Sequence, residues 1–302
     1  MSSLVLWLLL VARATPASAH SHNVTVPGLG TLYGRESGLW ASVSVFHGVP
    51  YAKAPIGDLR WRSPEPHGSW LSPRDASRPR SACIGAYGKD EALFNATSED
   101  CLFLSVASPA EVLGGDARLP VMVWIHGGSF DVGASTLPIY NLDAFAARSR
   151  SPVVAVALNY RLNAFGFLGS EALRSRSSSG SVGNYGIEDQ RLALAWVRSH
   201  IGAFGGNGED VTIFGQSSGG VSVLNHLTQP LSYRLYAKAV IESGTFASSS
   251  SMAGAEANFK ILAGGLGCQA VSCLLNSSAQ DIYRALTSSA TSAPVWGPVI
   301  DG

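Results

Sequence analysis

Ser217 lies at the centre of the segment Gly215–Gly219, which reads Gly-Gln-Ser-Ser-Gly. The apolar run Val211–Phe214 leads into this segment, and helix-forming residues follow from Val221. A strand, a sharp turn and a helix with serine at the turn form a nucleophile elbow, in which flanking glycines leave room for strained backbone. We therefore expect Ser217 to act as a nucleophile beside the positive end of the helix. The alternative is a plain strand-to-helix turn, because the bare pattern is weak in a glycine- and serine-rich chain.

A second segment, His126–Phe130, reads His-Gly-Gly-Ser-Phe and follows the apolar run Val121–Ile125. Small residues at the end of a strand let backbone N–H groups turn towards an oxygen that becomes negatively charged, and one such donor contributes about 3 kcal/mol to the transition state. The residue after the nucleophile, Ser218, supplies a further amide in this arrangement. His126 precedes the glycines, so we expect it to support the loop rather than to catalyse. Either segment alone could be a glycine turn, but together they predict an oxyanion hole beside a nucleophile.

Four short apolar runs are expected to form the strands that carry these loops. They alternate with helical patterns and are Val121–Ile125, Val153–Leu158, Val211–Phe214 and Ala239–Ile241. Between the second and third runs, apolar residues recur every three or four positions, as in an amphipathic helix. These residues are Leu194, Val197, Ile201 and Phe204. Continuous apolar strands separated by helices predict an α/β chain with a mostly parallel sheet and helices on both faces.

Two kinds of segment fall outside this pattern. The shorter, alternating runs Val24–Val26 and Val43–Val45 resemble antiparallel edge strands, and the serine-rich stretches 175–181 and 248–251 resemble surface loops. No linker divides the chain, so we expect a single domain over residues 20–302.

Charge and composition exclude several classes of protein. The chain has 302 residues, and its 21 Lys and Arg balance its 21 Asp and Glu, without a basic stripe that would bind nucleic acid. Hydrophobic residues make up 46% of the chain, which argues against intrinsic disorder. The cysteines form no Cys-x-x-Cys pattern and no histidine cluster accompanies them, so we expect no metal site.

The N-terminus predicts secretion. The apolar run Leu4–Ala12 is followed by Ala17-Ser18-Ala19, which indicates a signal peptide over residues 1–19 with cleavage after Ala19. The run is too short to span a bilayer; a buried strand or helix is the alternative. Three glycosylation acceptors agree with secretion and lie at Asn23, Asn95 and Asn276. Two structural disulfides also agree with it, in any of three connectivities among Cys83, Cys101, Cys268 and Cys273.

From about Thr31 onward the sequence resembles the type-B carboxylesterases, the family of α/β hydrolases that includes the cholinesterase-like enzymes. Beside the two loops above, the resemblance rests on a set of further motifs. They are Phe46–Ala52, Leu59–Trp61, Ser98–Leu102, Asn159–Arg161, Phe165–Leu168, Gly183–Asn184, Asp189–Val197, Phe204–Gly206, Glu242–Gly244 and Pro298–Gly302. The resemblance implies the α/β-hydrolase fold and a serine carboxylic-ester hydrolase that acts on a small-molecule ester through an acyl-serine, without a cofactor.

The same resemblance assigns roles to individual residues. It implies that the amides of Gly128, Ser129 and Ser218 form the oxyanion hole. It pairs the cysteines as Cys83–Cys101 and Cys268–Cys273, and it implies the ion pairs Arg60–Glu99 and Arg161–Asp189.

The sequence also departs from the family pattern. Gln216 stands where cholinesterases usually carry glutamate, and Ser218 where alanine is common. No tryptophan lies between Cys83 and Cys101, where choline-binding members place one, so a choline ester is a poor candidate for the substrate.

The sequence after Ser217 does not offer the acid and the histidine that would activate this nucleophile. In α/β hydrolases the acid and then the histidine follow the serine. Here the only later histidine is His226, nine residues along the same expected helix and roughly 13 Å away. The resemblance places the acid and the histidine beyond Gly302. We therefore expect the N-terminal portion of a longer esterase, with later strands absent, an apolar edge uncovered and little activity alone. A non-catalytic cholinesterase-like binding or adhesion domain, or a lipase with a long acyl pocket, are the alternatives.

Overall fold

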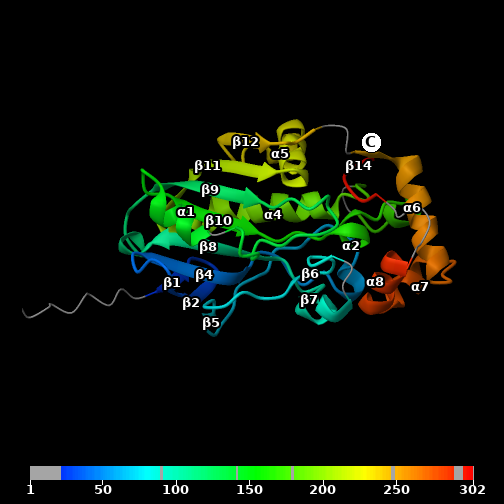
Figure 1. Cartoon of the computed structure of the whole chain (residues 1–302), viewed down its shortest axis with the longest axis horizontal. Helices are drawn as coiled ribbons and strands as arrows, with labels where there is room; N and C mark the ends of the chain where they lie inside the picture. Colours follow the sequence, from blue (N-terminus) through cyan, green and yellow to red (C-terminus); the bar gives the residue numbers. More distant parts are fainter. Residues whose placement is uncertain are drawn as a thin grey trace, which may run out of the picture.

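The computed structural model describes residues 22–88, 91–140, 142–177, 180–245, 249–288 and 295–301. The expected signal peptide lies outside these residues. At the centre is a seven-stranded sheet in the order β12-β11-β9-β10-β8-β4-β3 (Figure 1). In chain order its strands are β3 (Arg35–Glu36), β4 (Val43–Pro50), β8 (Phe103–Pro109), β9 (Leu119–Ile125), β10 (Val154–Leu158), β11 (Gly206–Gln216) and β12 (Lys238–Glu242).

The four apolar runs predicted as strands form one parallel block. They correspond to β9, β10, β11 and β12, which are neighbours and run parallel to one another. The other three strands are antiparallel to their neighbours, so the sheet is mixed. The sequence pattern did not predict β8, and it placed Val43–Val45 at an edge. This segment belongs to β4, which is covered on its outer side by the two-residue strand β3.

Helices cover both faces of the sheet, as predicted. On one face α4 (Tyr185–His200) and α5 (Ser218–Thr228) pack against the parallel strands, and on the other α1 (Leu142–Arg148) packs against β8 and β10 (Figure 1). The four residues of the predicted amphipathic helix are all fully buried. The helix itself ends earlier than predicted, because residues Ile201–Phe204 form a 3-10 turn that Gly205 closes at φ 79°.

Smaller elements surround the central sheet. The short sheets comprise β1 (Asn23–Val26), β2 (Gly30–Tyr33) and β5 (Arg74–Asp75); β6 (Ala82–Cys83) and β7 (Thr97–Ser98); and β13 (Ser250–Ser251) and β14 (Val299–Ile300). The remaining helices are α2 (Asn163–Phe167), α3 (Glu171–Arg174), α6 (Met252–Gly265), α7 (Val271–Asn276) and α8 (Ala279–Ser288). Part of the predicted serine-rich loop is thus strand β13, whose Ser251 caps α6 by accepting a hydrogen bond from the amide of Gly254.

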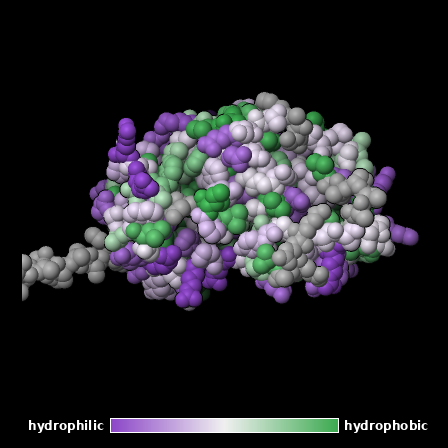
Figure 2. All heavy atoms as spheres, viewed as in Figure 1, coloured by the Kyte–Doolittle hydropathy of each residue, from purple (hydrophilic) through white to green (hydrophobic). Residues whose placement is uncertain are grey.

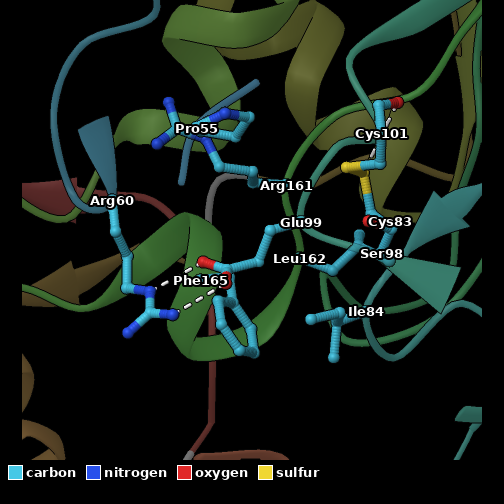
Figure 3. A pocket seen from close by; sticks show the side chains of 10 residues that line it. All are labelled: Pro55, Arg60, Cys83, Ile84, Ser98, Glu99, Cys101, Arg161, Leu162 and Phe165. Carbon is cyan, nitrogen blue, oxygen red and sulfur yellow. Dashed lines mark hydrogen bonds and ion pairs between the residues drawn. A yellow bond between two sulfur atoms is a disulfide. The ribbon is translucent and has the colours of Figure 1, made fainter. Parts of the chain in front are cut away.

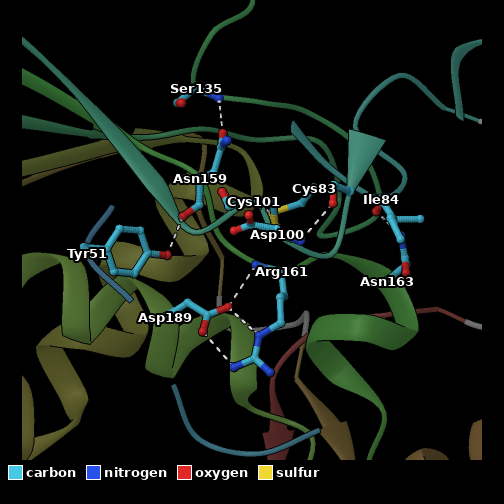
Figure 4. Close-up of a disulfide and its surroundings, with 11 residues drawn as sticks. Tyr51, Cys83, Ile84, Asp100, Cys101, Ser135, Asn159, Arg161, Asn163 and Asp189 are labelled. Carbon is cyan, nitrogen blue, oxygen red and sulfur yellow. Dashed lines mark hydrogen bonds and ion pairs between the residues drawn. A yellow bond between two sulfur atoms is a disulfide. The ribbon is translucent and has the colours of Figure 1, made fainter. Parts of the chain in front are cut away.

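The cysteines pair as the resemblance implied, Cys83 with Cys101 and Cys268 with Cys273. Close to the first disulfide, the buried Arg161 guanidinium forms two hydrogen bonds with the carboxylate of Asp189, of 2.8 and 2.7 Å (Figure 4). The backbone amide of Arg161 donates a third, of 3.0 Å. This pair therefore fixes the end of β10 to α4.

Arg60 joins distant parts of the chain. Its guanidinium forms two hydrogen bonds of 2.7 Å with Glu99, beside a small cavity (Figure 3). The same group donates to the carbonyl oxygens of Leu274, Leu275 and Ser277, at 3.3, 3.1 and 2.8 Å. These carbonyls belong to the last turn of α7 and the residue after it, where a helix leaves acceptors unsatisfied. Arg60 therefore anchors the C-terminal helices to the N-terminal half.

The surface agrees with several expectations. The three asparagines of the glycosylation acceptors are exposed. Among the residues that the structure describes, no helix has the length and apolar character needed to cross a membrane. The outer strand β12 leaves Val240 and Ile241 44% and 38% exposed, which is the uncovered apolar edge that the sequence predicted.

Candidate active site

Ser217 occupies the junction between a strand and a helix. β11 ends at Gln216 and α5 begins at Ser218, so Ser217 alone forms the turn. Its backbone has φ 56° and ψ −125°, a region that non-glycine residues rarely adopt and that persists only where neighbouring structure holds it. Its amide donates a 2.9 Å hydrogen bond to the carbonyl oxygen of Glu242, at the end of β12. The predicted elbow geometry is therefore present.

The glycines of the elbow are required by close backbone contacts. A Cβ atom at Gly219 would lie 2.1 Å from the carbonyl oxygen of Ile125, and one at Gly215 would lie 2.6 Å from main-chain atoms of Gly219. A Cβ atom at Gly220 would lie 2.8 Å from the carbonyl oxygen of Glu242. The elbow therefore packs tightly between the ends of β9 and β12. A side chain at any of these three glycines would displace it.

The His126–Phe130 loop meets the elbow directly. A Cβ atom at Gly127 would lie 2.6 Å from the carbonyl oxygen of Gln216 and 3.3 Å from the Cβ atom of Ser217. The next three residues, Gly128, Ser129 and Phe130, all have positive φ, at 122°, 56° and 58°. Three consecutive residues in this region turn the chain sharply at the end of β9. The two loops singled out in the sequence are therefore brought together beside Ser217.

Three backbone amides, where the elbow meets the His126–Phe130 loop, have no hydrogen-bond acceptor among the described residues. Among the described residues, the N–H groups of Gly128, Ser129 and Ser218 donate to no main-chain or side-chain acceptor. Buried or semi-buried amides usually find a partner, so uncommitted donors at one site call for an explanation. An oxygen that gains negative charge beside Ser217 would satisfy them.

His126 is held in a neutral, structural arrangement. Its Nδ1 atom lies 2.9 Å from the carbonyl oxygen of Gly127, which can only accept, so Nδ1 carries the proton. The ring stacks on Tyr160 with centroids 4.4 Å apart, and the Tyr160 hydroxyl donates to the carbonyl oxygen of His126 at 2.8 Å. Burial lowers the pKa of His126 to about 4. The arrangement fits the expectation that His126 supports the loop.

His226 is likewise committed to the interior. Its fully buried ring bonds the side-chain oxygen of Gln190 through Nε2 at 3.1 Å and Ser232 Oγ through Nδ1 at 3.0 Å. Burial, and then the positive charge of Arg191, lower its pKa to about 3. Both ring nitrogens are therefore occupied away from Ser217, in agreement with the prediction that His226 is not its base.

A hydrogen-bond chain that was not predicted from the sequence connects His226 to the elbow. Gln190 Nε2 donates to Ser222 Oγ at 3.0 Å, and Ser222 Oγ donates to the carbonyl oxygen of Ser218 at 2.9 Å. Because Gln190 Oε1 must accept, His226 Nε2 carries the ring proton and Nδ1 accepts from Ser232. The chain fastens α5, which begins at the elbow, to α4. The one signal in the sequence was His226, a polar residue on the apolar helix α5.

Two further features of the described residues concern metal ligands and a small cavity. In the described parts of the chain, no group of three or more His, Cys, Asp or Glu residues is arranged to hold a metal ion. The small cavity of Figure 3 is lined by Arg60, Glu99, Arg161, the Cys83–Cys101 disulfide and apolar neighbours. None of its lining residues belongs to the elbow or to the His126–Phe130 loop.

Comparison with known proteins identifies the family. The sequence model described as "Carboxylesterase family" matches residues 20–302. The chain belongs to the carboxylesterase family. The cholinesterase of Mus musculus is 34% identical over 325 residues, covering 99% of this chain and 52% of that protein. The fumonisin B1 esterase of Sphingopyxis macrogoltabida is 39% identical over 244 residues, covering 80% of this chain and 44% of that protein.

A solved structure supports the same conclusion. The Geobacillus stearothermophilus carboxylesterase EST55 superposes with a TM-score of 0.82 at 35% identity, covering 93% of this chain and 56% of that one. The α/β-hydrolase fold inferred from the sequence is thereby confirmed. This carboxylesterase-family chain spans about half the length of the curated relatives it matches.

Proposed function

We propose that this carboxylesterase-family chain carries the nucleophile and the oxyanion hole of a secreted serine carboxylic-ester hydrolase. The observation that supports this most strongly is the strained backbone of Ser217, held against a loop in which the amides of Gly128 and Ser129 have no acceptor among the described residues. A structural turn would have no need of such strain, since it could use glycine at the apex.

In the proposed reaction, Ser217 Oγ attacks the carbonyl carbon of an ester. The carbonyl oxygen becomes negatively charged and accepts hydrogen bonds from the amides of Gly128, Ser129 and Ser218, each contributing about 3 kcal/mol. The base of the triad takes the proton of Ser217 Oγ and gives it to the leaving alcohol, and water, activated by the same base, then releases the acid from the acyl-serine and restores the serine hydroxyl. These steps need no cofactor.

The general base is the missing part of this reaction. His126 and His226 are both engaged elsewhere, and each has a lowered pKa. We propose that the acid and the histidine of the triad come from polypeptide corresponding to the part of the relatives that this chain does not span. Removing the histidine of such a triad costs about 10⁶ in rate, so the 302 residues alone should be nearly inactive.

We also propose that the chain is secreted and glycosylated. The expected signal peptide over residues 1–19, the two disulfides and the exposed acceptors Asn23, Asn95 and Asn276 support this assignment.

A chimera tests the proposed activity. Residues 22–302 are followed by the part of the Geobacillus carboxylesterase that lies beyond its region of similarity, so that the foreign segment supplies the acid and the histidine. We expect hydrolysis of p-nitrophenyl acetate that Ser217→Ala abolishes. The matched control is Ser149→Ala, which removes an exposed serine hydroxyl far along the chain from the elbow.

Two results would overturn parts of the proposal. A chimera that folds, by circular dichroism and thermal unfolding, but hydrolyses no ester would refute the catalytic role and favour a non-catalytic binding domain. Robust hydrolysis by the 302-residue chain alone, lost in Ser217→Ala, would instead refute the claim that it lacks a base.

A further inference from the structure

Ser218, whose amide we assign to the oxyanion hole, is also held from inside the fold. Its carbonyl oxygen accepts a 2.9 Å hydrogen bond from Ser222 Oγ, one turn further along α5. Ser222 is the last member of a polar chain that continues through Gln190 and His226 to Ser232. These last four residues are fully buried, so none of them reaches the surface shown in Figure 2. Buried polar groups are costly unless every member is paired, and here all four are paired in a line that ends at the elbow.

The positions of the protons in this chain follow from its end at the elbow. A carbonyl oxygen can only accept, so the single proton of Ser222 Oγ points to Ser218. Ser222 must then accept from the amide nitrogen of Gln190, at 3.0 Å, and the amide oxygen of Gln190 must accept from His226 Nε2, at 3.1 Å. His226 Nδ1 therefore accepts from Ser232 Oγ, at 3.0 Å. Every donor in the chain points towards the elbow.

The chain begins beside a positive charge. Arg191 Nε donates to Ser232 Oγ at 3.4 Å. Burial, and then the charge of Arg191, lower the pKa of His226 to about 3, so the ring is neutral at pH 7 and passes on a hydrogen bond without a charge of its own. Aligned hydrogen bonds polarise one another in a low-dielectric interior. The elbow therefore receives the positive end of a chain that starts at a guanidinium group.

Two effects at Ser218 follow from this arrangement. The amide and the carbonyl group belong to one residue, so a fixed carbonyl limits the directions in which the amide can point. Because α5 begins at Ser218, the chain also adds to the positive end of this helix, where the ester oxygen would become negative. Both effects favour the transition state over the bound ester, since the negative charge develops only as the transition state forms.

We propose that Ser222 and Gln190 are positioning residues of the ester hydrolase, and that the chain from Arg191 holds the Ser218 amide in place and adds positive potential for the oxyanion. This inference rests on the proposed function, which supplies the negative charge. The alternative is that the chain only fastens α5 to α4. A fastening would change stability alone, whereas a positioning chain changes kcat and leaves KM nearly unchanged.

The proton positions can be tested on the 302-residue chain itself, without any activity. Nitrogen chemical shifts of the His226 ring, measured by NMR at pH 7, distinguish the two neutral forms of the imidazole. We expect the proton on Nε2. A proton on Nδ1 would reverse the hydrogen bonds of the chain and overturn the proposal.

Ser222→Ala in the active chimera tests the positioning role. We expect kcat for p-nitrophenyl acetate to fall about tenfold with KM changed less than about twofold, a smaller loss than the roughly 10²–10³ that follows removal of a direct oxyanion donor. A trifluoromethyl ketone, which forms a tetrahedral adduct with the serine, should bind about tenfold more weakly. The matched control is Ser108→Ala, because Ser108 is also fully buried and its hydroxyl donates to the carbonyl oxygen of Phe204 at 2.8 Å. This control should lose a similar free energy of unfolding and keep its kcat.

Gln190→Met breaks the chain one hydrogen bond earlier. We expect kcat to fall about threefold, because Ser222 can still donate to Ser218 but is no longer polarised or held by Gln190. In a chimera that already carries Ser222→Ala, Gln190→Met should cause no further loss of kcat, since Gln190 acts through Ser222.

The outcomes separate this inference from the proposed function. If the wild-type chimera is active and Ser217→Ala abolishes its activity, while Ser222→Ala keeps its kcat, the proposed function stands and the positioning role is refuted. Independent losses in the double variant, or a change in KM alone, would also refute the positioning role. A folded wild-type chimera that hydrolyses no ester would overturn the proposed function and this inference with it.

Discussion

Acidification should destabilise this protein through its two buried, neutral histidines. His226 and His126 lie inside the fold with pKa values of about 3 and about 4, below the ordinary value of 6.5. Between these values and 6.5 the unfolded chain binds more protons than the folded chain. The contribution of the two neutral histidines to the free energy of unfolding is therefore complete above pH 6.5 and decreases as the pH falls below this value.

The magnitude follows from the two lowered pKa values. At pH 5, about 1.5 units below the ordinary pKa of 6.5, each histidine is protonated in the unfolded state but remains mostly neutral in the folded state. The unfolded state is therefore stabilised by the free energy of these 1.5 units at each histidine. At 1.36 kcal/mol per unit, each histidine costs about 2 kcal/mol of stability at pH 5, and the two together cost about 4 kcal/mol. This is a large share of the stability of an ordinary domain.

Urea unfolding at pH 7 and pH 5 measures this effect. In His226→Gln, which does not titrate, we expect the loss of unfolding free energy between the two pH values to shrink by about 2 kcal/mol. The difference between variant and wild type isolates His226 from buried carboxyl groups such as Glu188, whose pKa burial raises. His67→Gln, at a partly exposed ring, is the control. Equal losses in the wild type and His226→Gln would refute the reasoning.

Three other perturbations have defined outcomes. Gly127→Ala places a Cβ atom 2.6 Å from a main-chain oxygen of the elbow, so turnover of the active chimera should fall at least ~10²-fold, and unchanged turnover would contradict the packing. Arg161→Met leaves the Asp189 carboxylate buried without its partner and should lower unfolding free energy by about 3–5 kcal/mol in urea; a loss below about 1 kcal/mol would contradict it. Replacing Cys83 and Cys101 by serine opens a link across 18 residues and should cost about 3 kcal/mol by thermal unfolding, whereas an unchanged Tm would show that the link adds no stability.

The parts of the site that depend on local sequence were predictable. Ser217 and the His126–Phe130 loop each follow an apolar strand, and parallel neighbouring strands bring their carboxyl ends to one edge of the sheet. The strand pattern alone therefore predicts that the two loops lie near each other. The contact itself, with Gly127 against the elbow, depends on the register of β9 with β11, which no local pattern encodes.

Long-range features were harder to predict. β8 was missed because its residues are buried on both faces and lack the alternation of an antiparallel strand. The extent of α4 was overestimated because the apolar spacing continues through Phe204, while Gly205 ends the helical segment in a left-handed conformation. The Gln190–His226 chain joins two helices through residues 36 positions apart, so only the packed fold reveals it.

The hydrogen bonds from Arg60 to the end of α7 also set an order of events during synthesis. The acceptor at Ser277 lies 217 residues later in the chain. At about 5–20 residues per second, the ribosome needs roughly 10–45 s after making Arg60 to supply this carbonyl group. During that interval Glu99 is already available to neutralise the guanidinium, but the surface that later receives α7 remains exposed. The nascent chain therefore passes through a stage in which strands β3 to β12 have been synthesised while the helices α6 to α8 still await docking.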